Sequence, residues 1–226
     1  LVYSWGRGDL GALLQADDLN HTPGEGPAVL RSRRSILQVA SALYHSVVVT
    51  STGDVLACGS NEEGQARPDR PEEPLFVKPT LVEPLLAHRV TQVACGLYHT
   101  ACITSSGVAL SFGGNEAGQL GHSPGSLCRV PPRTIQGPTW SRHRLAARVA
   151  CGDLFTLVLT SRSEVYSCGL SDCVGRGGDA DGPDGAGRRR AALVDGLAGV
   201  PVVSVACGNS HAVAVTAAGA APSPGV

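Results

Sequence analysis

The sequence predicts an all-β fold, a partial β-propeller of about four four-stranded blades. Two motifs that recur at one period predict it. The first begins at valines spaced 54, 56 and 56 residues apart, at Val39, Val93, Val149 and Val205. The second keeps step with it and ends in glycine each time, at Gly6, Gly59, Gly113 and Gly169. Two motifs in register at a fixed period indicate a repeat architecture.

Each repeat is expected to supply four short strands. In the second copy these are Thr80–Pro84, Val90–Cys95, His99–Thr104 and Val108–Phe112. Glycine-containing turns at 51–54 and 105–107 are expected to join the last two strands, because glycine readily adopts positive φ. Stacking such units around an axis buries both faces of each. The small residues of the Val-Ala-Cys-Gly segments place them on the innermost strand, and no 3.6-residue apolar pattern supports a helical solenoid.

Three segments resemble the regulator of chromosome condensation repeat family: Tyr3-Ser4-Trp5-Gly6, the GGNEAGQLG run at 113–121, and the VACGLYHT run at 93–100. The resemblance covers about residues 1–219 and implies a seven-bladed propeller. The copies lie at roughly 26–59, 79–113, 130–169 and 191–219, with 1–6 ending a preceding copy and 220–226 forming a Pro/Gly tail. The remaining blades are expected outside this chain. Closure into four blades, by pairing of 1–5 with the last copy, is the less favoured alternative.

Composition excludes several classes of partner. The 226 residues carry a formal net charge of −1, so no global field attracts nucleic acid or an acidic membrane surface. No apolar run reaches the roughly 20 residues that span a bilayer. Among the eight cysteines there is no Cys-x-x-Cys pair. Five of them occupy repeat positions held elsewhere by serine or aromatic residues, at Cys58, Cys95, Cys151, Cys168 and Cys207. We therefore expect structural thiols and an intracellular location, cytoplasmic or nuclear.

The segment from Gly6 to Gly11 matches the G-x-G-x-x-G fingerprint of dinucleotide-binding proteins. The repeat offers a simpler explanation. The same positions hold Gly, Asn and Gly in the next two copies, at Gly59, Asn61, Gly64 and at Gly113, Asn115, Gly118. Glycine and asparagine both tolerate left-handed backbone, so a turn is expected here and no cofactor.

Two further patterns suggest metals and are better explained structurally. One repeat position holds His45, His99 and His211 but Phe155 in the third copy, so hydrogen bonding is expected rather than metal ligation. The segment 179–185 resembles a calcium loop, but EF-hand positions six and twelve hold Asp184 and Arg190. A Gly-rich surface loop over 175–190 is expected. No catalytic Ser–His–Asp, Cys–His or paired-carboxylate arrangement is recognisable, so the chain is not expected to be an enzyme.

The clearest candidate for partner binding is a departure from the repeat. The third copy carries an insertion between Ile135 and Ala146, inside an Arg-rich stretch without acidic residues, 129–148. Insertions in repeats often form binding loops, and Trp and Arg are enriched at interface hot spots. The candidate residues are Trp140, Arg142, His143, Arg144 and Arg148, which the run 188–190 could extend. They would contact an acidic protein surface or phosphate. The alternative is a solvated loop with Trp140 packed on a neighbouring blade, and the loop 61–74 is expected to be an exposed connection.

The resemblance implies a protein-interaction module of a regulatory or multidomain protein. The alternative is a guanine-nucleotide exchange factor for a small GTPase, because the founding member of the family acts on Ran while bound to chromatin. No exchange wedge aligns with a loop of this chain, and chromatin is a weakly supported partner. A light sensor like the plant ultraviolet-B photoreceptor would need clustered tryptophans, but the chain has only Trp5 and Trp140. We expect a protein partner, with no membrane, cofactor or small-molecule substrate.

Overall fold

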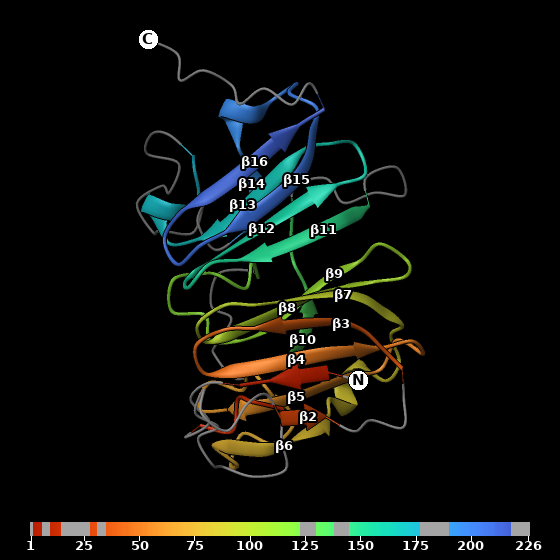
Figure 1. Cartoon of the computed structure of the whole chain (residues 1–226). Helices are drawn as coiled ribbons and strands as arrows, with labels where there is room; N and C mark the ends of the chain where they lie inside the picture. The colour runs from red at the N-terminus through yellow and green to blue at the C-terminus, as the bar shows by residue number, and fades with distance from the viewer. Residues whose placement is uncertain are drawn as a thin grey trace.

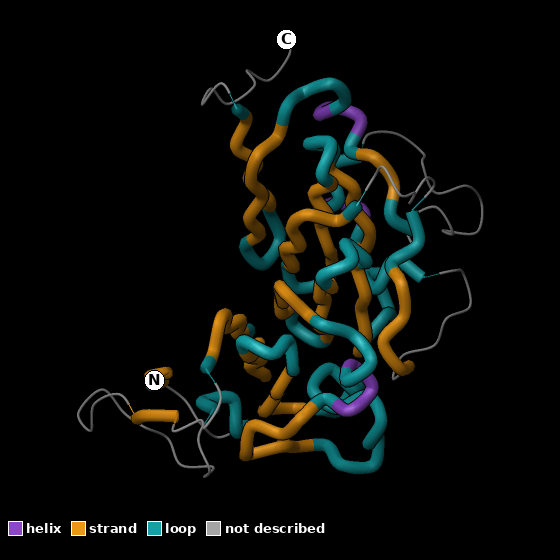
Figure 2. The backbone as a smooth tube through the Cα atoms, turned by 90° about the vertical axis from the view of Figure 1, so that its right-hand side faces the viewer, coloured by secondary structure: helices purple, strands orange, loops and turns teal. Residues whose placement is uncertain are grey.

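The computed structural model describes residues 2–5, 10–14, 28–30, 35–122, 130–137, 145–176 and 190–217. Strands and their connections make up nearly all of this part of the chain, with helix limited to short 3-10 turns (Figures 1 and 2). None of the described segments forms a helix of the length and apolarity that crossing a bilayer requires. The prediction of an all-β fold is confirmed.

Three complete antiparallel blades follow one another along the arc in Figure 1. The first contains β3 (Ile36–Ser41), β4 (His45–Thr50), β5 (Val55–Ser60) and β6 (Leu75–Leu81). The second contains β7 (Val90–Cys95), β8 (His99–Thr104), β9 (Ala109–Gly113) and β10 (Val130–Thr134). The third contains β11 (Ala146–Cys151), β12 (Phe155–Thr160), β13 (Val165–Gly169) and β14 (Ala192–Leu193).

Two strand pairs flank these blades. β1 (Val2–Ser4) pairs with β2 (Ala28–Leu30), and β15 (Val202–Cys207) pairs with β16 (Ala212–Thr216). In repeat terms the first pair corresponds to the outer half of a blade and the second pair to the inner half. The two pairs lie at opposite ends of the arc, so β1 does not close a ring with β16 (Figure 1). The four-blade closure considered from the sequence is not the arrangement found here.

The outermost strand of each blade comes from the following sequence copy. β6 pairs with β5, with Leu56 opposite Leu81 and Ser60 opposite Leu75. The strand expected at Thr80–Pro84 was therefore wrong in its bounds. It ends at Leu81, and Glu83–Leu85 forms the 3-10 turn η1, with a proline in its first two positions. The fixed φ of Pro84, near −65°, suits the first positions of such a turn, whereas β6 tolerates Pro79 because it is the edge strand of its blade.

The core lies between successive blades. The second strands β4, β8 and β12 are buried at every residue, because a neighbouring blade covers each face. Val47 and Val49 of β4, for example, belong to the same hydrophobic cluster as Leu110 and Phe112 of β9 in the next blade. The first strands contact one another from blade to blade, which confirms that the Val-Ala-Cys segments are innermost.

Every innermost strand carries a register shift at the same repeat position. The shifts fall between Ile36 and Gln38, Val90 and Gln92, Ala146 and Arg148, and Val202 and Ser204. A β-bulge turns the next side chain away from its regular direction. In the first two blades it directs Gln38 and Gln92, each just before the recurrent valine, toward the following blade.

Candidate functional site

The loops between the first and second strands of successive blades lie together along one side of the arc. One repeat position in these loops holds Tyr44, Tyr98 and Leu154. Their carbonyl oxygens accept hydrogen bonds from the backbone N–H groups that follow or end the third strands, at Ser60 (2.8 Å), Gly114 (2.7 Å) and Leu170 (2.9 Å). The same hydrogen bond in three blades fixes these side chains in a row.

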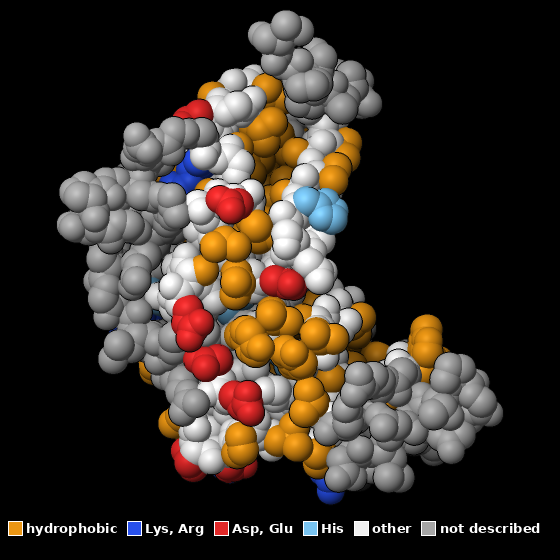
Figure 3. All heavy atoms as spheres, turned by 90° about the vertical axis from the view of Figure 1, so that its left-hand side faces the viewer, with side chains coloured by type: hydrophobic (Ala, Val, Ile, Leu, Met, Phe, Trp, Pro, Cys, Tyr) orange, Lys and Arg blue, Asp and Glu red, His pale blue; other side chains and the backbone are white. Residues whose placement is uncertain are grey.

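Tyr44 and Tyr98 come from adjacent blades, yet their rings stack with centroids 5.5 Å apart and planes at 27°. Leu43 beside them is 69% exposed, which is high for a leucine side chain. Figure 3 shows hydrophobic side chains gathered on this side of the molecule with acidic side chains around them. We call the group the tyrosine face: Leu43, Tyr44, Leu97, Tyr98, Leu154, Glu62, Glu63 and Glu116.

A cavity of about 330 Å³ opens in the tyrosine face. Its lining residues are Glu62, Glu63, Leu97, Tyr98, Gly114, Glu116, Gln119 and Leu154. Glu62 and Glu116 stand at the same repeat position in successive blades. Within the described part of the chain, neither they nor Glu63 form an ion pair. Partial burial, the hydroxyl of Tyr44 and the carboxylates of Glu62 and Glu63 raise the pKa of Tyr98. The three lining glutamates make the cavity electronegative.

The loops that carry the face are internally braced. Asn61 accepts hydrogen bonds from the N–H groups of Ala66 and Arg67, and its amide donates to three carbonyl oxygens of the same loop. The glycine positions of the turn are left-handed as expected, with φ of 108° at Gly59 and 78° at Gly64. The asparagine is not. Its side chain organises the loop, and this corrects the expectation that it tolerates left-handed backbone.

The acidic loop 61–74 was expected to be a plain exposed connection, and this was wrong for its first half. Arg67 is only 1% exposed and forms a bidentate pair with Asp69, with nitrogen–oxygen distances of 3.0 and 2.6 Å. Its guanidinium also lies 5.7 Å from the centroid of the Phe76 ring. The side-chain hydrogen bond between Arg67 and Asp69 raises the pKa of Arg67 and lowers that of Asp69. A buried arginine requires such a partner.

Buried histidines bridge successive blades. Nε2 of His45 lies 2.8 Å from Oγ1 of Thr100, and Nε2 of His99 lies 2.8 Å from Oγ1 of Thr156. Each threonine hydroxyl donates to a backbone carbonyl, at Gln65 and at Gln119. The hydroxyl proton is thus committed, so the imidazole must donate from Nε2. The expectation of structural hydrogen bonding is confirmed for these two histidines.

The remaining imidazole nitrogen, Nδ1, is buried without a partner in both residues. Burial therefore lowers the pKa of His45 to about 4 and that of His99 to about 3. At neutral pH both are uncharged and act as hydrogen-bond donors. His211, at the same repeat position on β15–β16, is exposed.

A second bridge uses the bulged strands. The side-chain amide of Gln38 both accepts from the N–H of Val93 (2.9 Å) and donates to its carbonyl (3.1 Å). Oε1 of Gln92 accepts from the N–H of Val149 at 2.9 Å. The bridge satisfies a backbone group on the open edge of the next innermost strand. The sequence analysis missed it, although glutamine precedes valine in both copies.

The candidate partner-binding residues named from the sequence are mostly outside the described part of the chain. Trp140, Arg142, His143 and Arg144 fall there, as do the loop 179–185 and the first two glycines of the G-x-G-x-x-G match. Arg148 is described. It is exposed and occupies the repeat position of Gln38 and Gln92, facing the third junction. Since arginine has no acceptor atom, it cannot receive a backbone N–H as glutamine does.

The described cysteines are free thiols, as expected. Burial raises the pKa of Cys58, Cys102, Cys168 and Cys207 to about 12, so they stay protonated and unreactive. Cys95, Cys151 and Cys207 line a space of about 340 Å³ where the innermost strands converge. In the residues that the structure covers, no three His, Cys, Asp or Glu side chains come together to hold a metal ion.

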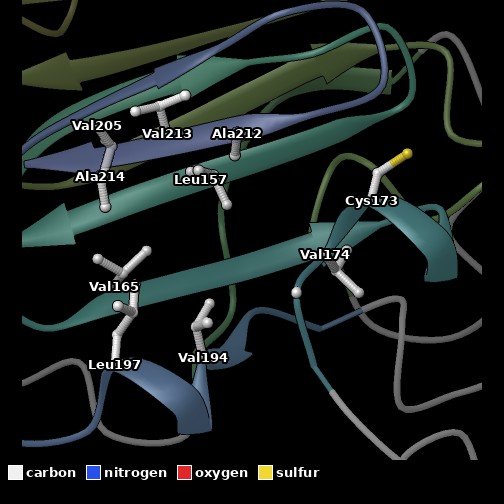
Figure 4. A pocket seen from close by; sticks show the side chains of 11 residues that line it. Leu157, Val165, Cys173, Val174, Val194, Leu197, Val205, Ala212, Val213 and Ala214 are labelled. Carbon is white, nitrogen blue, oxygen red and sulfur yellow. The ribbon is translucent and has the colours of Figure 1, made fainter. Parts of the chain in front are cut away.

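A separate cavity of about 350 Å³ lies between the third blade and β15–β16 (Figure 4). Leu157, Val165, Val194, Leu197 and Val205 are among the mostly apolar side chains that point into it. In the junction before it, the third-strand residues Tyr166 and Cys168 belong to the core. Within the described residues β16 pairs with β15 alone. The cavity is thus a consequence of a two-stranded unit packing on a four-stranded one.

Four-stranded antiparallel blades that pack face to face, with their innermost strands in contact from blade to blade, are typical of β-propellers. Two models of the regulator of chromosome condensation (RCC1) repeat match the sequence, one at 52–103 and 106–159 and the other at 36–65, 90–119 and 146–173. The chain belongs to this RCC1 repeat family. The resemblance drawn from the sequence motifs is confirmed.

Several curated proteins are similar to the chain. Human E3 ubiquitin-protein ligase HERC2 is 32% identical over 222 residues, which cover 96% of this chain and 4% of HERC2. The mouse inhibitor of Bruton tyrosine kinase is 35% identical over 182 residues, 75% of this chain and 12% of that protein. The Xenopus laevis kinase Nek9 is 30% identical over 180 residues, 74% and 18% of the two chains. The chain thus spans only a small part of these relatives.

Solved structures agree on the fold. Human WBSCR16 superposes with a TM-score of 0.78 at 22% identity, covering 96% of this chain and 55% of that one. Prp20p from Saccharomyces cerevisiae superposes with a TM-score of 0.74 at 23% identity, covering 94% and 50%. At this identity the likeness concerns the fold alone. The chain corresponds to about half the length of each of these two proteins.

Proposed function

We propose that the chain is a protein–protein interaction module of a regulatory or multidomain protein, and that it binds through the tyrosine face. One observation carries the proposal: exposed leucine and stacked tyrosine side chains lie beside carboxylates without ion-pair partners, on loops that backbone hydrogen bonds hold in place. Exposed apolar groups rimmed by polar ones are typical of protein-binding surfaces. The relatives support a regulatory setting, since they include a ubiquitin ligase, a kinase and a kinase inhibitor.

A quantitative pulldown tests the proposal. The immobilised chain is compared with a Leu43→Ala, Tyr98→Ala variant and with a control, Leu86→Ala, whose side chain is 55% exposed on the turn after η1. We expect a defined set of proteins to be retained by the wild type and the control but lost from the face variant. Equal recovery by all three chains would contradict binding through this face.

The Arg-rich insertion is proposed as a separate contact for an acidic protein surface or phosphate. A Trp140→Ala, Arg142→Ala, Arg144→Ala variant tests it in the same pulldown, with Arg148→Ala and His143→Ala added singly. Unchanged recovery with these variants would remove the insertion from the binding surface without affecting the tyrosine face. The cytoplasmic or nuclear location stays a prediction.

Guanine-nucleotide exchange is the alternative. Prp20p, which shares the fold, is described with binding properties to Gsp1p and histones. A nucleotide-release assay with a panel of small GTPases separates the two functions. For a pure interaction module we expect no acceleration with any member of the panel, and accelerated release from one GTPase would favour exchange. The same assay tests the expectation that the chain is not an enzyme, as far as exchange activity is concerned.

A further inference from the structure

The cavity in the tyrosine face combines features that together select a ligand. Its volume of about 330 Å³ is at the low end for ligand pockets, so it takes one or two side chains better than a nucleotide or cofactor. Glu62 and Glu63 reach it from the first blade and Glu116 from the second, while Leu97 and Leu154 supply apolar walls. The ring of Tyr98 lines it as well.

Among the described residues, nothing compensates the negative charge of the cavity. The nearest arginines along the same loop are engaged elsewhere: Arg67 pairs with Asp69, and Arg70 pairs with Glu73 at 2.7 Å. None of the three cavity glutamates forms an ion pair with another residue of the described part of the chain. An anionic ligand such as phosphate would be repelled and a cation attracted, so the charge of the cavity favours a cationic ligand. The carboxylates do not form a cluster that could hold a metal ion, which favours an organic cation.

The aromatic and apolar walls narrow the choice further. A guanidinium is planar and weakly hydrated, stacks on aromatic rings and binds carboxylates through two parallel hydrogen bonds. Its aliphatic stem can pack against leucine. An ammonium group is more strongly hydrated and lacks the planar fork. Carboxylates, a tyrosine ring and leucines in one cavity therefore match arginine better than lysine.

The cavity is also preorganised. The backbone carbonyl of Tyr98 accepts a hydrogen bond from the N–H of Gly114. The N–H of Leu97 donates to the backbone carbonyl of Asp153 in the next blade at 3.2 Å. The N–H of Glu63 donates to the buried side chain of Gln65 at 2.9 Å. A wall fixed before binding loses little conformational entropy when the ligand enters.

We propose that the tyrosine face binds an arginine-bearing segment of a partner protein, with a guanidinium placed between Tyr98 and the carboxylates of the cavity. This inference rests on the proposed interaction function and specifies the partner's chemistry at that face.

Fluorescence anisotropy tests the inference with a fluorescein-labelled nonapeptide of alternating Arg, Leu and Gly. Two comparison peptides replace every Arg by Lys or by uncharged citrulline. We expect the Arg peptide to bind about tenfold more tightly than the Lys peptide, as stacking and bidentate contacts are lost with Lys. The citrulline peptide should not bind measurably. Raising the salt concentration should weaken binding of the Arg peptide, because its ionic contacts with the carboxylates are partly exposed.

Two matched pairs of substitutions locate the contact. Glu62→Gln with Glu116→Gln should weaken binding about tenfold or more, whereas Glu72→Gln with Asp195→Asn changes the net charge equally, away from the cavity, and should change it less than about twofold. Tyr98→Leu should reduce the preference for Arg over Lys. That variant should fold, because Leu154 occupies the same position in the third blade.

Equal binding of the Arg and Lys peptides, or equal loss with both charge pairs, would overturn the inference in favour of nonspecific attraction. Absence of binding would overturn it as well. In either case a pulldown that still depends on Leu43 and Tyr98 would keep the interaction function, with a partner of different chemistry.

Discussion

The imidazole of His99 donates from Nε2 to the hydroxyl of Thr156 in the next blade, across 2.8 Å. The same bond joins His45 to Thr100 one blade earlier. At the third junction the corresponding residues are Phe155 and Ala212, so donor and acceptor are replaced together by apolar groups. A paired replacement removes the donor and the acceptor of this bond together, whereas a single one leaves the remaining partner buried and unsatisfied.

This pairing predicts strong coupling between His99 and Thr156. Thr156→Ala leaves both ring nitrogens of His99 buried without partners, and His99→Phe brings a larger ring against the threonine hydroxyl. We expect each single variant to destabilise the chain by roughly 1–3 kcal/mol. The double variant copies the third junction. Its loss in the free energy of unfolding should be at least about 1 kcal/mol smaller than the sum of the two single losses. Urea unfolding of all four proteins measures the coupling, and strictly additive effects would contradict it.

The buried histidines also predict a loss of stability in mild acid. Their pKa values, about 4 for His45 and His122 and about 3 for His99, lie below the ordinary 6.5. Between pH 6.5 and these lower pKa values, the unfolded chain binds more protons than the folded one. The free energy of unfolding therefore falls as the pH drops. The loss is on the order of 3 kcal/mol per histidine by pH 4.

Urea unfolding between pH 7 and pH 4 measures this loss. The His99→Phe, Thr156→Ala double variant should show a shallower dependence, since one buried imidazole is gone. A wild-type stability that stays constant over this range would refute the assignment of neutral, buried histidines.

Arg148 predicts a stabilising substitution. It stands where Gln38 and Gln92 accept a backbone N–H from the next blade, but it has no acceptor to offer Val205. Arg148→Gln should add this hydrogen bond and stabilise the chain by about 1 kcal/mol. The reciprocal Gln92→Arg should destabilise it by a similar amount or more. Thermal melting compares them with Arg133→Gln as the control, and a neutral Arg148→Gln would mean that the third junction cannot form the bridge.

The hairpin turn of the third blade predicts a second stabilising substitution. Ser163 adopts a φ of 65° where the first two copies have Gly53 and Gly107, with φ of 88° and 75°. Left-handed backbone costs an L-residue roughly 1–2 kcal/mol in the folded chain, and glycine avoids this strain. Glycine also increases the conformational entropy of the unfolded chain, which offsets part of the gain in stability. Ser163→Gly should therefore raise the melting temperature slightly. Ser161→Gly, at a position without positive φ, should lower it, and the reverse order would exclude backbone strain as the cause.

The turns and inner strands were predictable because they depend on local chemistry. Gly53 and Gly107 mark positive φ, and the recurrent valines mark innermost strands. The tyrosine face was not found in the sequence. The stacking of Tyr44 and Tyr98 depends on the angle between blades. The carboxylates of Glu62 and Glu63 lie 36 and 35 residues before Tyr98 in the sequence, and that of Glu116 lies 18 residues after it.

By itself the sequence determined the repeat, the strand-rich fold and the architectural character of most histidines, glycines and cysteines, because a fixed period imposes one environment on every copy. Only the tertiary structure decided which blade each outer strand joins, which side chains cross the junctions, and where apolar and acidic groups meet. The contacts that cross the junctions join residues more than fifty positions apart, such as Gln38 with Val93 and His99 with Thr156. Blade stacking creates these contacts, and no local pattern encodes them.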